Sequence, residues 1–151
     1  MKKLNLPEFE FRLRKSNDRT EIFDEFRKKY IVLTPEEWVR QNLLKYLHYN
    51  KNIPKGLIVV EKGLILNQLK KGTDILVYTR KGNPCMIVEC KSPDITIDQN
   101  TFEQIARYNM TLKVDYLLVS NGLEHFCCKI DIENKSFSFL KDIPDFETLN
   151  L

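Results

Sequence analysis

Gly72-Thr73-Asp74-Ile75-Leu76-Val77-Tyr78 and, after a Gly-containing turn, Met86-Ile87-Val88-Glu89-Cys90-Lys91-Ser92-Pro93 make up the stretch that decides the fold. Each segment contains a short apolar run typical of a buried strand, with charged residues at one end. Side chains alternate between the two faces of a strand, so Glu89 and Lys91 should share a face while Cys90 points the other way. Pairing of the two strands would bring Asp74 beside them.

Helices are predicted on both sides of this hairpin. Thr34-Pro35-Glu36-Glu37 has a threonine cap, a proline and a capping-box glutamate, and predicts a helix that runs to about Tyr49. Asp98 or a near neighbour should cap a second helix that runs to about Leu112. For the first helix, the spacing predicts a core-facing stripe of Val39, Leu43, Tyr46 and Leu47, with Glu37, Arg40, Gln41, Leu44 and His48 on another face.

The remaining apolar runs predict strands. One candidate edge strand lies in Glu8–Arg14, where Phe9, Phe11 and Leu13 alternate with polar residues. Others are Leu57–Val60, Tyr116–Val119, His125–Ile130 and Ser136–Leu140, with an irregular tail from Pro144. This order predicts one domain, residues 1–151, of mixed α/β (α+β) class, in which a mixed β-sheet is flanked by helices.

Two neighbouring carboxylates repel each other when both are ionised, and an oxygen-ligated divalent cation relieves that repulsion. Asp74 and Glu89 would therefore hold Mg²⁺, with Mn²⁺ as a substitute, together with the backbone carbonyl of Cys90 and water. Lys91 would orient the attacking water and stabilise charge in the transition state of phosphodiester hydrolysis. Spacing alone also fits a strand-entry aspartate followed by a surface ion pair between Glu89 and Lys91.

The array Asp74…Glu89-Cys90-Lys91, between a helix bearing Glu37 and a helix bearing Gln104-x-x-x-Tyr108, resembles the PD-(D/E)XK nuclease superfamily. Four further motifs look like the N-terminal nuclease domain of type I restriction enzyme R subunits. They are Phe26-Arg27-Lys28-Lys29-Tyr30, Thr34-Pro35-Glu36-Glu37-Trp38-Val39-Arg40-Gln41, Val88-Glu89-Cys90-Lys91 and Ala106-Arg107-Tyr108-Asn109-Met110. The resemblance spans roughly Ile22 to Leu140.

The resemblance implies a restriction-endonuclease-like core, about residues 22–140, that cuts DNA with Mg²⁺. Asp74 and Glu89 would be the metal ligands and Lys91 the catalytic lysine. Glu37 would match the first-helix acid of the superfamily, although a local capping role explains it equally well. Gln104 and Tyr108 would match an element beside the active site, against the alternative of a polar helix face with a half-buried tyrosine.

The net charge of +3 is unevenly distributed. Residues 1–51 hold 12 Lys and Arg against 8 Asp and Glu, whereas residues 52–151 hold 12 against 13. Because lysine and arginine contacts to phosphates supply most sequence-independent affinity for nucleic acids, two basic clusters are candidate DNA contacts. An ordinary solvated face is the alternative for both clusters, which are Arg12, Arg14 and Lys15, and Arg27, Lys28 and Lys29.

No apolar run approaches the roughly 20 residues that span a bilayer, so we expect a cytoplasmic protein with no membrane partner. The four cysteines lack CxxC spacing, which favours buried, reduced thiols over a zinc site.

The leading functional hypothesis is a metal-dependent DNA endonuclease domain. A catalytically silent DNA-binding or assembly module of the same fold is the alternative, and a homodimer that pairs edge to edge is a third. The sequence has no GxxxxGK[ST] phosphate loop, so any motor that the nuclease uses lies elsewhere, in motor or specificity subunits of a restriction system.

Overall fold

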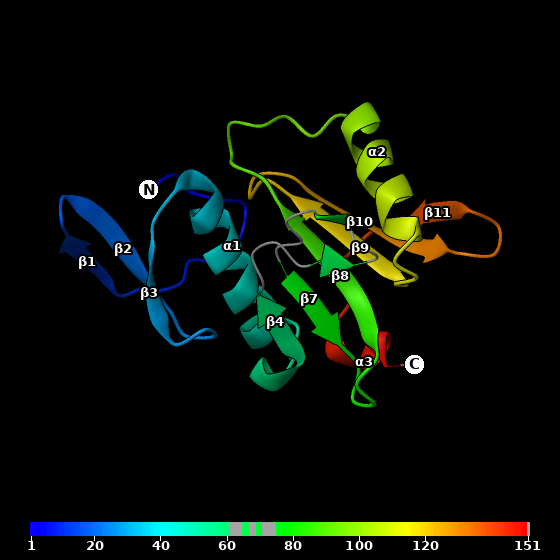
Figure 1. Ribbon diagram of the computed structural model, residues 1–151, viewed down its shortest axis with the longest axis horizontal. Helices are drawn as coiled ribbons and strands as arrows, with labels where there is room; N and C mark the ends of the chain where they lie inside the picture. The colour runs from blue at the N-terminus through cyan, green and yellow to red at the C-terminus, as the bar shows by residue number, and fades with distance from the viewer. Residues whose placement is uncertain (61–64, 67–68, 71–74, 151) are drawn as a thin grey trace.

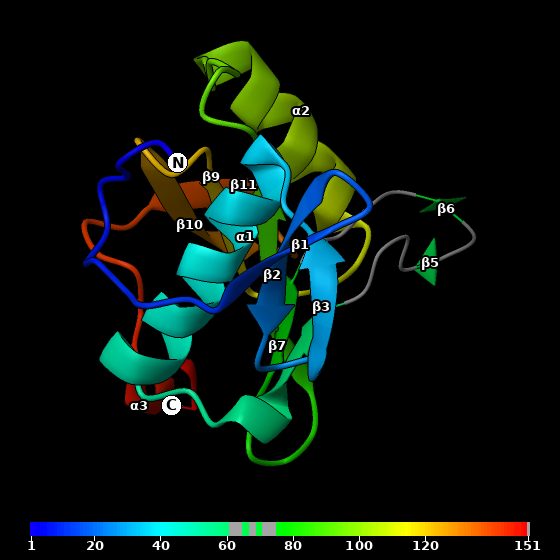
Figure 2. The same cartoon turned by 90° about the vertical axis from the view of Figure 1, so that its left-hand side faces the viewer.

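Helix α1 (Pro35–Lys45) lies between two β-sheets in the computed structural model, which describes residues 1–60, 65–66, 69–70 and 75–150 (Figure 1). The smaller sheet has three antiparallel strands in the order β1-β2-β3, with β1 at Leu13–Ser16, β2 at Arg19–Asp24 and β3 at Lys29–Val32. Figure 2, in which this sheet is nearest the viewer, shows α1 and the larger sheet behind it.

The larger sheet has six strands in the order β11-β10-β9-β8-β7-β4. Strands β8 and β9 are parallel and all other neighbours are antiparallel, so the sheet is mixed as the sequence predicts. The strand bounds are β4 Ile58–Val60, β7 Ile75–Tyr78, β8 Pro84–Cys90, β9 Tyr116–Ser120, β10 His125–Asp131 and β11 Ser136–Phe139. A separate two-stranded hairpin joins β5 (Ile65–Leu66) and β6 (Leu69–Lys70).

Helix α2 (Gln99–Met110) provides the crossover between β8 and β9 and covers one face of the larger sheet, while α1 covers the other. Strand alternation separates the two cores. Val77 and Met86 pack on the α1 side, whereas Leu76 and Ile87 pack on the α2 side with Phe102. The fold is therefore of mixed α/β class, which confirms the predicted class.

The predicted helix caps are confirmed. The Oγ1 atom of Thr34 accepts a hydrogen bond from the backbone N–H of Glu37 at 3.0 Å, and Asp98 accepts one from Thr101 at 2.7 Å. The first helical segment extends to about its predicted end, but the α-helix itself stops at Lys45 and a π-helical turn covers Tyr46–Asn50. A 3₁₀ turn at Lys55–Leu57 then leads into β4.

Two predictions about the chain ends are wrong. The strand predicted for Glu8–Arg14 begins only at Leu13, as β1, so Phe9 and Phe11 lie before it. Their rings pack against Tyr49 and Trp38, with ring centroids 6.4 and 5.2 Å apart. The tail predicted to be irregular forms the short helix α3 (Phe146–Leu149), whose cap is Asp145.

Core-facing residues of α1 also differ from the prediction. Val39, Leu43 and Leu47 are fully buried as expected, but Tyr46 is only half-buried. Leu44, assigned from the sequence to the other face, is fully buried. The sequence pattern did not reveal that the three-stranded sheet covers this second face of the helix.

Three cysteines, Cys85, Cys127 and Cys128, are buried free thiols, as predicted, and Cys90 is buried as well. Burial raises the pKa of the Cys127 thiol to about 12 and those of Cys85 and Cys128 to about 11. Across the described part of the chain, every helix is too short or too polar to cross a membrane.

Candidate active site at the end of β8

The last residues of β8 and the first of the following loop carry the candidate catalytic side chains. Glu89 lies beside Val119 in the parallel register of β8 and β9 and is 2% exposed. Since Val119 and Ile87 both belong to the core beneath α2, the alternation of the strand places Glu89 on the α2 side of the sheet. The backbone N–H of Lys91 donates to the Ser120 carbonyl at 2.8 Å, which extends the parallel pairing by one residue.

Lys91 is half-buried, and the hydrogen bond to Ser120 fixes its backbone. The loop after it is tied to the end of β9, because the side-chain amide of Asn121 donates to the Ile95 carbonyl at 2.8 Å. The side-chain Oδ1 of Asn121 accepts hydrogen bonds from the backbone N–H groups of Leu123 and Glu124. Glu89 thus lies on the α2 side of the sheet at the end of a buried strand, and Lys91 directly follows that strand; that their side chains share one face stays a prediction.

Asp74, the second predicted metal ligand, lies outside the described residues. Within the described ranges, no three His, Cys, Asp or Glu side chains gather closely enough to hold a metal ion. The donor chemistry nevertheless fits Mg²⁺, because Glu89 offers carboxylate oxygens and the adjacent backbone offers the Cys90 carbonyl, both of the hard oxygen type that Mg²⁺ prefers. A buried carboxylate is also stabilised by a nearby cation.

Glu37 is engaged in a buried polar network at the start of α1. Its Oε1 accepts from Arg40 at 2.6 Å, and its Oε2 accepts from Arg27 at 3.1 Å and from Gln41 at 2.9 Å. Asp24, fully buried on β2, accepts from the same Arg27 at 2.6 Å and from Gln41 at 2.9 Å. Both carboxylate oxygens of Glu37 therefore have protein donors, and the network joins α1 to the three-stranded sheet.

Burial raises the pKa of Asp24, but hydrogen bonds from Gln41 and Arg27 lower it by more, so the pKa lies below its ordinary value. The carboxylate of Glu37 turns to the arginines and Gln41, which differs from the predicted capping box. These contacts favour a structural role for Glu37 over metal ligation.

Gln104 and Tyr108 lie one turn apart on α2, beside the stripe formed by Phe102, Ile105 and Ala106 that packs on the sheet. Gln104 is exposed and Tyr108 is half-buried. They share with Glu89 the α2 side of the sheet, and their assignment to the active site stays a prediction.

The two basic clusters have different surroundings. Arg12, Arg14 and Lys15 are exposed on and before β1, and Lys28 and Lys29 are exposed at the start of β3. Arg27 differs, because its guanidinium is held by Asp24 and Glu37 and its side chain is only 19% exposed. Arg27 therefore serves the buried network, and the other five remain available to an external partner.

A serine and a histidine meet near the turn after β9 without forming a catalytic pair. The Ser120 hydroxyl lies 2.7 Å from His125 Nδ1 and accepts from the Gly122 N–H at 2.9 Å. The other ring nitrogen of His125 donates to the Asn5 carbonyl at 2.8 Å. Because Ser120 is fully buried, this arrangement anchors the N-terminal segment and cannot meet a substrate.

Residues 35–144 match the family model described as type I restriction enzyme R protein N terminus (HSDR_N). Among solved structures, the chain is similar to a fragment of a putative HsdR subunit of a type I restriction enzyme from Vibrio vulnificus YJ016. The identity is 22%, the TM-score is 0.38, and the match covers 61% of this chain and 17% of that one. No curated protein matches the chain. Because the matched region covers well over half of its length, the chain belongs to the family of type I restriction enzyme R protein N termini.

Proposed function

We propose that this chain is a metal-dependent endonuclease domain that hydrolyses phosphodiester bonds in DNA as part of a restriction system. The observation that carries the proposal is the buried Glu89 near the end of β8, followed two residues later by Lys91, whose backbone N–H donates to the Ser120 carbonyl. Family membership supports a role related to restriction. In this proposal the site is of the PD-(D/E)XK kind, and Asp74 is the second acid.

Glu89, together with Asp74 and the Cys90 carbonyl, would hold Mg²⁺. The bound ion would polarise a phosphate oxygen and lower the pKa of the attacking water. The role of Glu89 is to place the ion, because its carboxylate is fixed on a buried strand and loses little freedom on binding. Lys91 would bring its ammonium to the same face, where it would orient the water and stabilise the negative charge that develops on the phosphate.

DNA, motor subunits and specificity subunits are the partners that this proposal implies. The chain spans 17% of the length of the HsdR fragment that it matches, and its sequence lacks the phosphate loop of a motor. The exposed cations Arg12, Arg14, Lys15, Lys28 and Lys29 would contribute salt-dependent contacts to the DNA backbone.

The test is cleavage of supercoiled plasmid, linear duplex and single strands with Mg²⁺, Mn²⁺ or chelator. Lys91→Ala should lower the metal-dependent rate by about 10²–10³, because it removes a positioned charge that acts mainly in the transition state. Lys81→Ala, which truncates an exposed lysine in the β7–β8 turn, is the matched control and should cut like the wild type. Equal cleavage by Lys91→Ala and wild type would reject the proposed mechanism.

The metal site has an independent test. Ca²⁺ or Mn²⁺ should raise the melting temperature of the wild type and should not raise that of the Asp74→Asn, Glu89→Gln double variant. Metal-dependent stabilisation that persists in the double variant would place the ion elsewhere. Nucleic-acid binding without cleavage under any of these conditions would identify the alternative function, a silent DNA-binding module.

A further inference from the structure

The outer face of the three-stranded sheet carries a row of arginines stacked on aromatic rings. The register of the strands determines which side chains lie on this face. The Phe23 N–H donates to the Arg12 carbonyl, and Phe23 is opposite Tyr30, so these three residues form one row across the sheet. Arg14 is opposite Glu21 in the next row. The other face of the sheet carries Ile22 and Asp24, both fully buried toward α1.

Within these rows, guanidinium groups lie over ring faces. The Arg12 guanidinium is 4.1 Å from the Phe23 ring centroid, and the Arg14 guanidinium is 3.9 Å from the Tyr30 centroid. The two rings contact each other edge to face at 5.2 Å. We call Arg12, Phe23, Tyr30 and Arg14 the arginine–aromatic platform. A ring beneath each guanidinium holds its plane in place and leaves the opposite side open to a planar partner.

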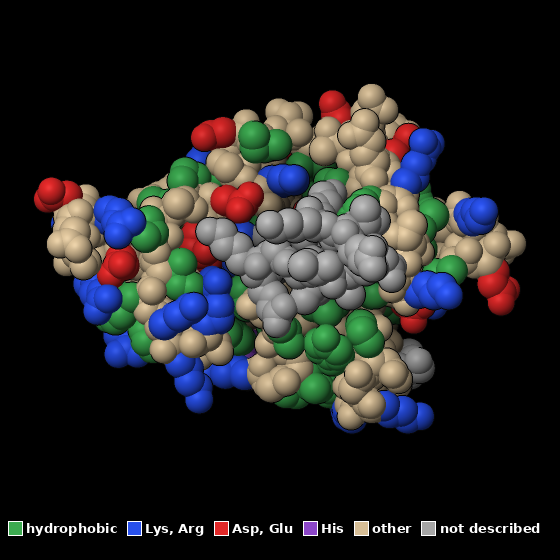
Figure 3. Space-filling view, viewed as in Figure 1, with side chains coloured by type: hydrophobic (Ala, Val, Ile, Leu, Met, Phe, Trp, Pro, Cys, Tyr) green, Lys and Arg blue, Asp and Glu red, His purple; other side chains and the backbone are tan. Residues whose placement is uncertain are grey.

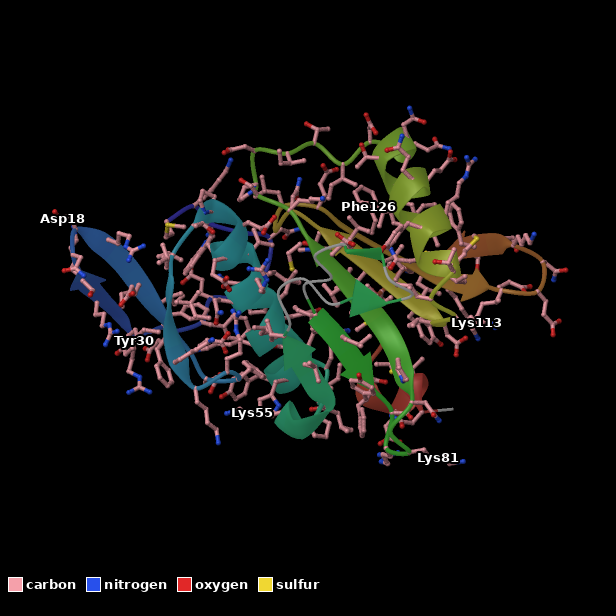
Figure 4. All side chains as sticks on the ribbon, viewed as in Figure 1. Asp18, Tyr30, Lys55, Lys81, Lys113 and Phe126 are labelled. Atoms are coloured by element: carbon pink, nitrogen blue, oxygen red, sulfur yellow. The ribbon has the colours of Figure 1, made fainter. Side chains whose placement is uncertain are left out.

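The platform is accessible and positively charged. Arg12 is exposed, the Arg14 side chain is 52% exposed, and Arg19 follows on the same face at the hairpin end. Glu21 is the acid on this face and pairs with Arg14 at 2.7 Å. Figure 3 shows Lys and Arg side chains gathered at this end of the molecule, and Figure 4 places Tyr30 and Asp18 there.

We propose that the arginine–aromatic platform binds single-stranded nucleic acid, with unpaired bases stacked on the guanidinium planes and phosphates paired with the arginine charges. This inference rests on the proposed function for the class of ligand, but it concerns a surface outside the matched region, which begins at residue 35. Bases in a duplex are stacked on each other and cannot reach a flat protein surface, whereas unpaired bases can.

The chemistry favours this occupant over two others. An acidic protein would meet the charges but would have no use for the ring-backed planes, and a second copy would bring its own arginines against these. Adjacent strands lie roughly 4.8 Å apart, so the row from Arg12 on the β1 side to Tyr30 on β3 extends over roughly 10 Å. That width accommodates more than one base along a strand.

The experiment measures fluorescence anisotropy of a labelled thymidine 20-mer and of a 20-base-pair duplex with the full chain, in chelator so that nothing is cut. Tyr30→Leu should weaken single-strand binding by about 5-fold or more, since the Arg14 guanidinium loses the ring that holds its plane in place for a base, and a base stack typically contributes that much. Tyr30→Phe keeps the ring and should bind like the wild type. Circular dichroism confirms that each variant is folded.

Charge is tested separately. Arg12→Gln with Arg14→Gln should flatten the dependence of log K on log salt by about 1.4, or 0.7 for each lost phosphate contact on a single strand. Lys81→Gln with Lys113→Gln removes the same charge at the other end of the molecule, where Figure 4 shows both lysines, and should leave the slope unchanged.

Equal losses from the two charge pairs, equal binding by Tyr30→Leu and Tyr30→Phe, or a wild type that binds duplex as tightly as single strand would each overturn the inference. The catalytic proposal fails by a different result, which is unimpaired cleavage by Lys91→Ala. The two failures are therefore distinguishable.

Discussion

Glu37 shows how one residue can satisfy a sequence motif and still have another role. Its position fits both a capping box and a nuclease acid, but its carboxylate accepts from Arg27, Arg40 and Gln41 and is 8% exposed. Each of these bonds has a charged acceptor, and such bonds contribute more than neutral ones. The side chain is thereby fixed as a link between α1 and the three-stranded sheet.

Glu37→Gln should therefore destabilise the protein and leave its metal affinity unchanged. Loss of the charge weakens the bonds from two arginines that remain beneath the surface, at a cost of about 1–3 kcal/mol in the free energy of unfolding. Urea denaturation measures that cost, and the midpoint of a Ca²⁺ titration followed by melting temperature measures metal affinity.

Glu89→Gln is the comparison, because it should weaken metal binding directly as a lost ligand. If Glu37→Gln shifts the Ca²⁺ midpoint as far as Glu89→Gln does, Glu37 is a metal ligand and the structural interpretation fails.

Secondary-structure elements were predictable where local signals were strong. Asp98 and Thr34 cap their helices as predicted, and β8 forms as a buried strand that ends beside Glu89, as its apolar run predicted. Errors came from tertiary packing. Phe9 and Phe11 alternate as in a strand, but their rings pack against Tyr49 on the π-helical turn and Trp38 on α1.

The functional surfaces show the same difference between local sequence signals, which are predictable, and tertiary packing, which is not. Arg27 is indistinguishable from Lys28 and Lys29 in a basic run, and only the buried Asp24 beneath it shows its structural role. The arginine–aromatic platform was missed because its aromatic members, Phe23 and Tyr30, come together through the pairing of β2 with β3. The turn residues Asn17 and Asp18, both with positive φ, gave a local signal only for the neighbouring hairpin of β1 and β2.

The turn between β9 and β10 depends on Gly122 for two reasons. Its φ is +86°, which disfavours other residues, and an added Cβ would lie 2.7 Å from Leu4 Cδ2 and 3.1 Å from Val39 Cγ2. The turn positions Asn121 and Ser120, which hold the backbone near Lys91. Close packing here therefore connects the N-terminal segment to the candidate active site.

A series of glycine-to-alanine variants separates backbone strain from steric clash. Gly56→Ala has open space and no positive φ, so its effect should be within about 0.5 kcal/mol of zero. Gly82→Ala has open space but a φ of +85°, and should cost about 1 kcal/mol from strain alone. Gly122→Ala combines strain and clash and should cost most, about 2–4 kcal/mol. Urea denaturation that ranks Gly122→Ala no worse than Gly82→Ala would show that Leu4 moves aside freely.

At the scale of the whole molecule, a three-stranded sheet precedes helix α1 and the six-stranded sheet in the chain. The family match begins at residue 35, so the three-stranded sheet lies outside the matched region. Side-chain hydrogen bonds join this sheet to α1. The main polar contact is the network of Asp24, Arg27, Glu37 and Gln41. Cooperative unfolding of the two parts should therefore depend on the ionisation of the buried acids.

Acid should destabilise the whole molecule through Asp24. Its pKa is below the ordinary value of 3.8 in the folded state, so the unfolded chain binds the proton more readily. A lowered pKa contributes stability that is present above the unfolded value and is lost as pH falls through the folded value. The urea midpoint should therefore fall as the pH drops below about 4.

Asp24→Asn should start from a lower urea midpoint at neutral pH and show a shallower fall with acid, because the variant has no carboxylate to protonate there. Trp38 lies on α1, so its intrinsic fluorescence reports on the helix, whereas circular dichroism at strand wavelengths reports on the sheets. The two signals should show one transition if the network joins α1 to the three-stranded sheet. An Asp24→Asn variant whose midpoint falls with pH as steeply as the wild type would locate the acid sensitivity in other carboxylates.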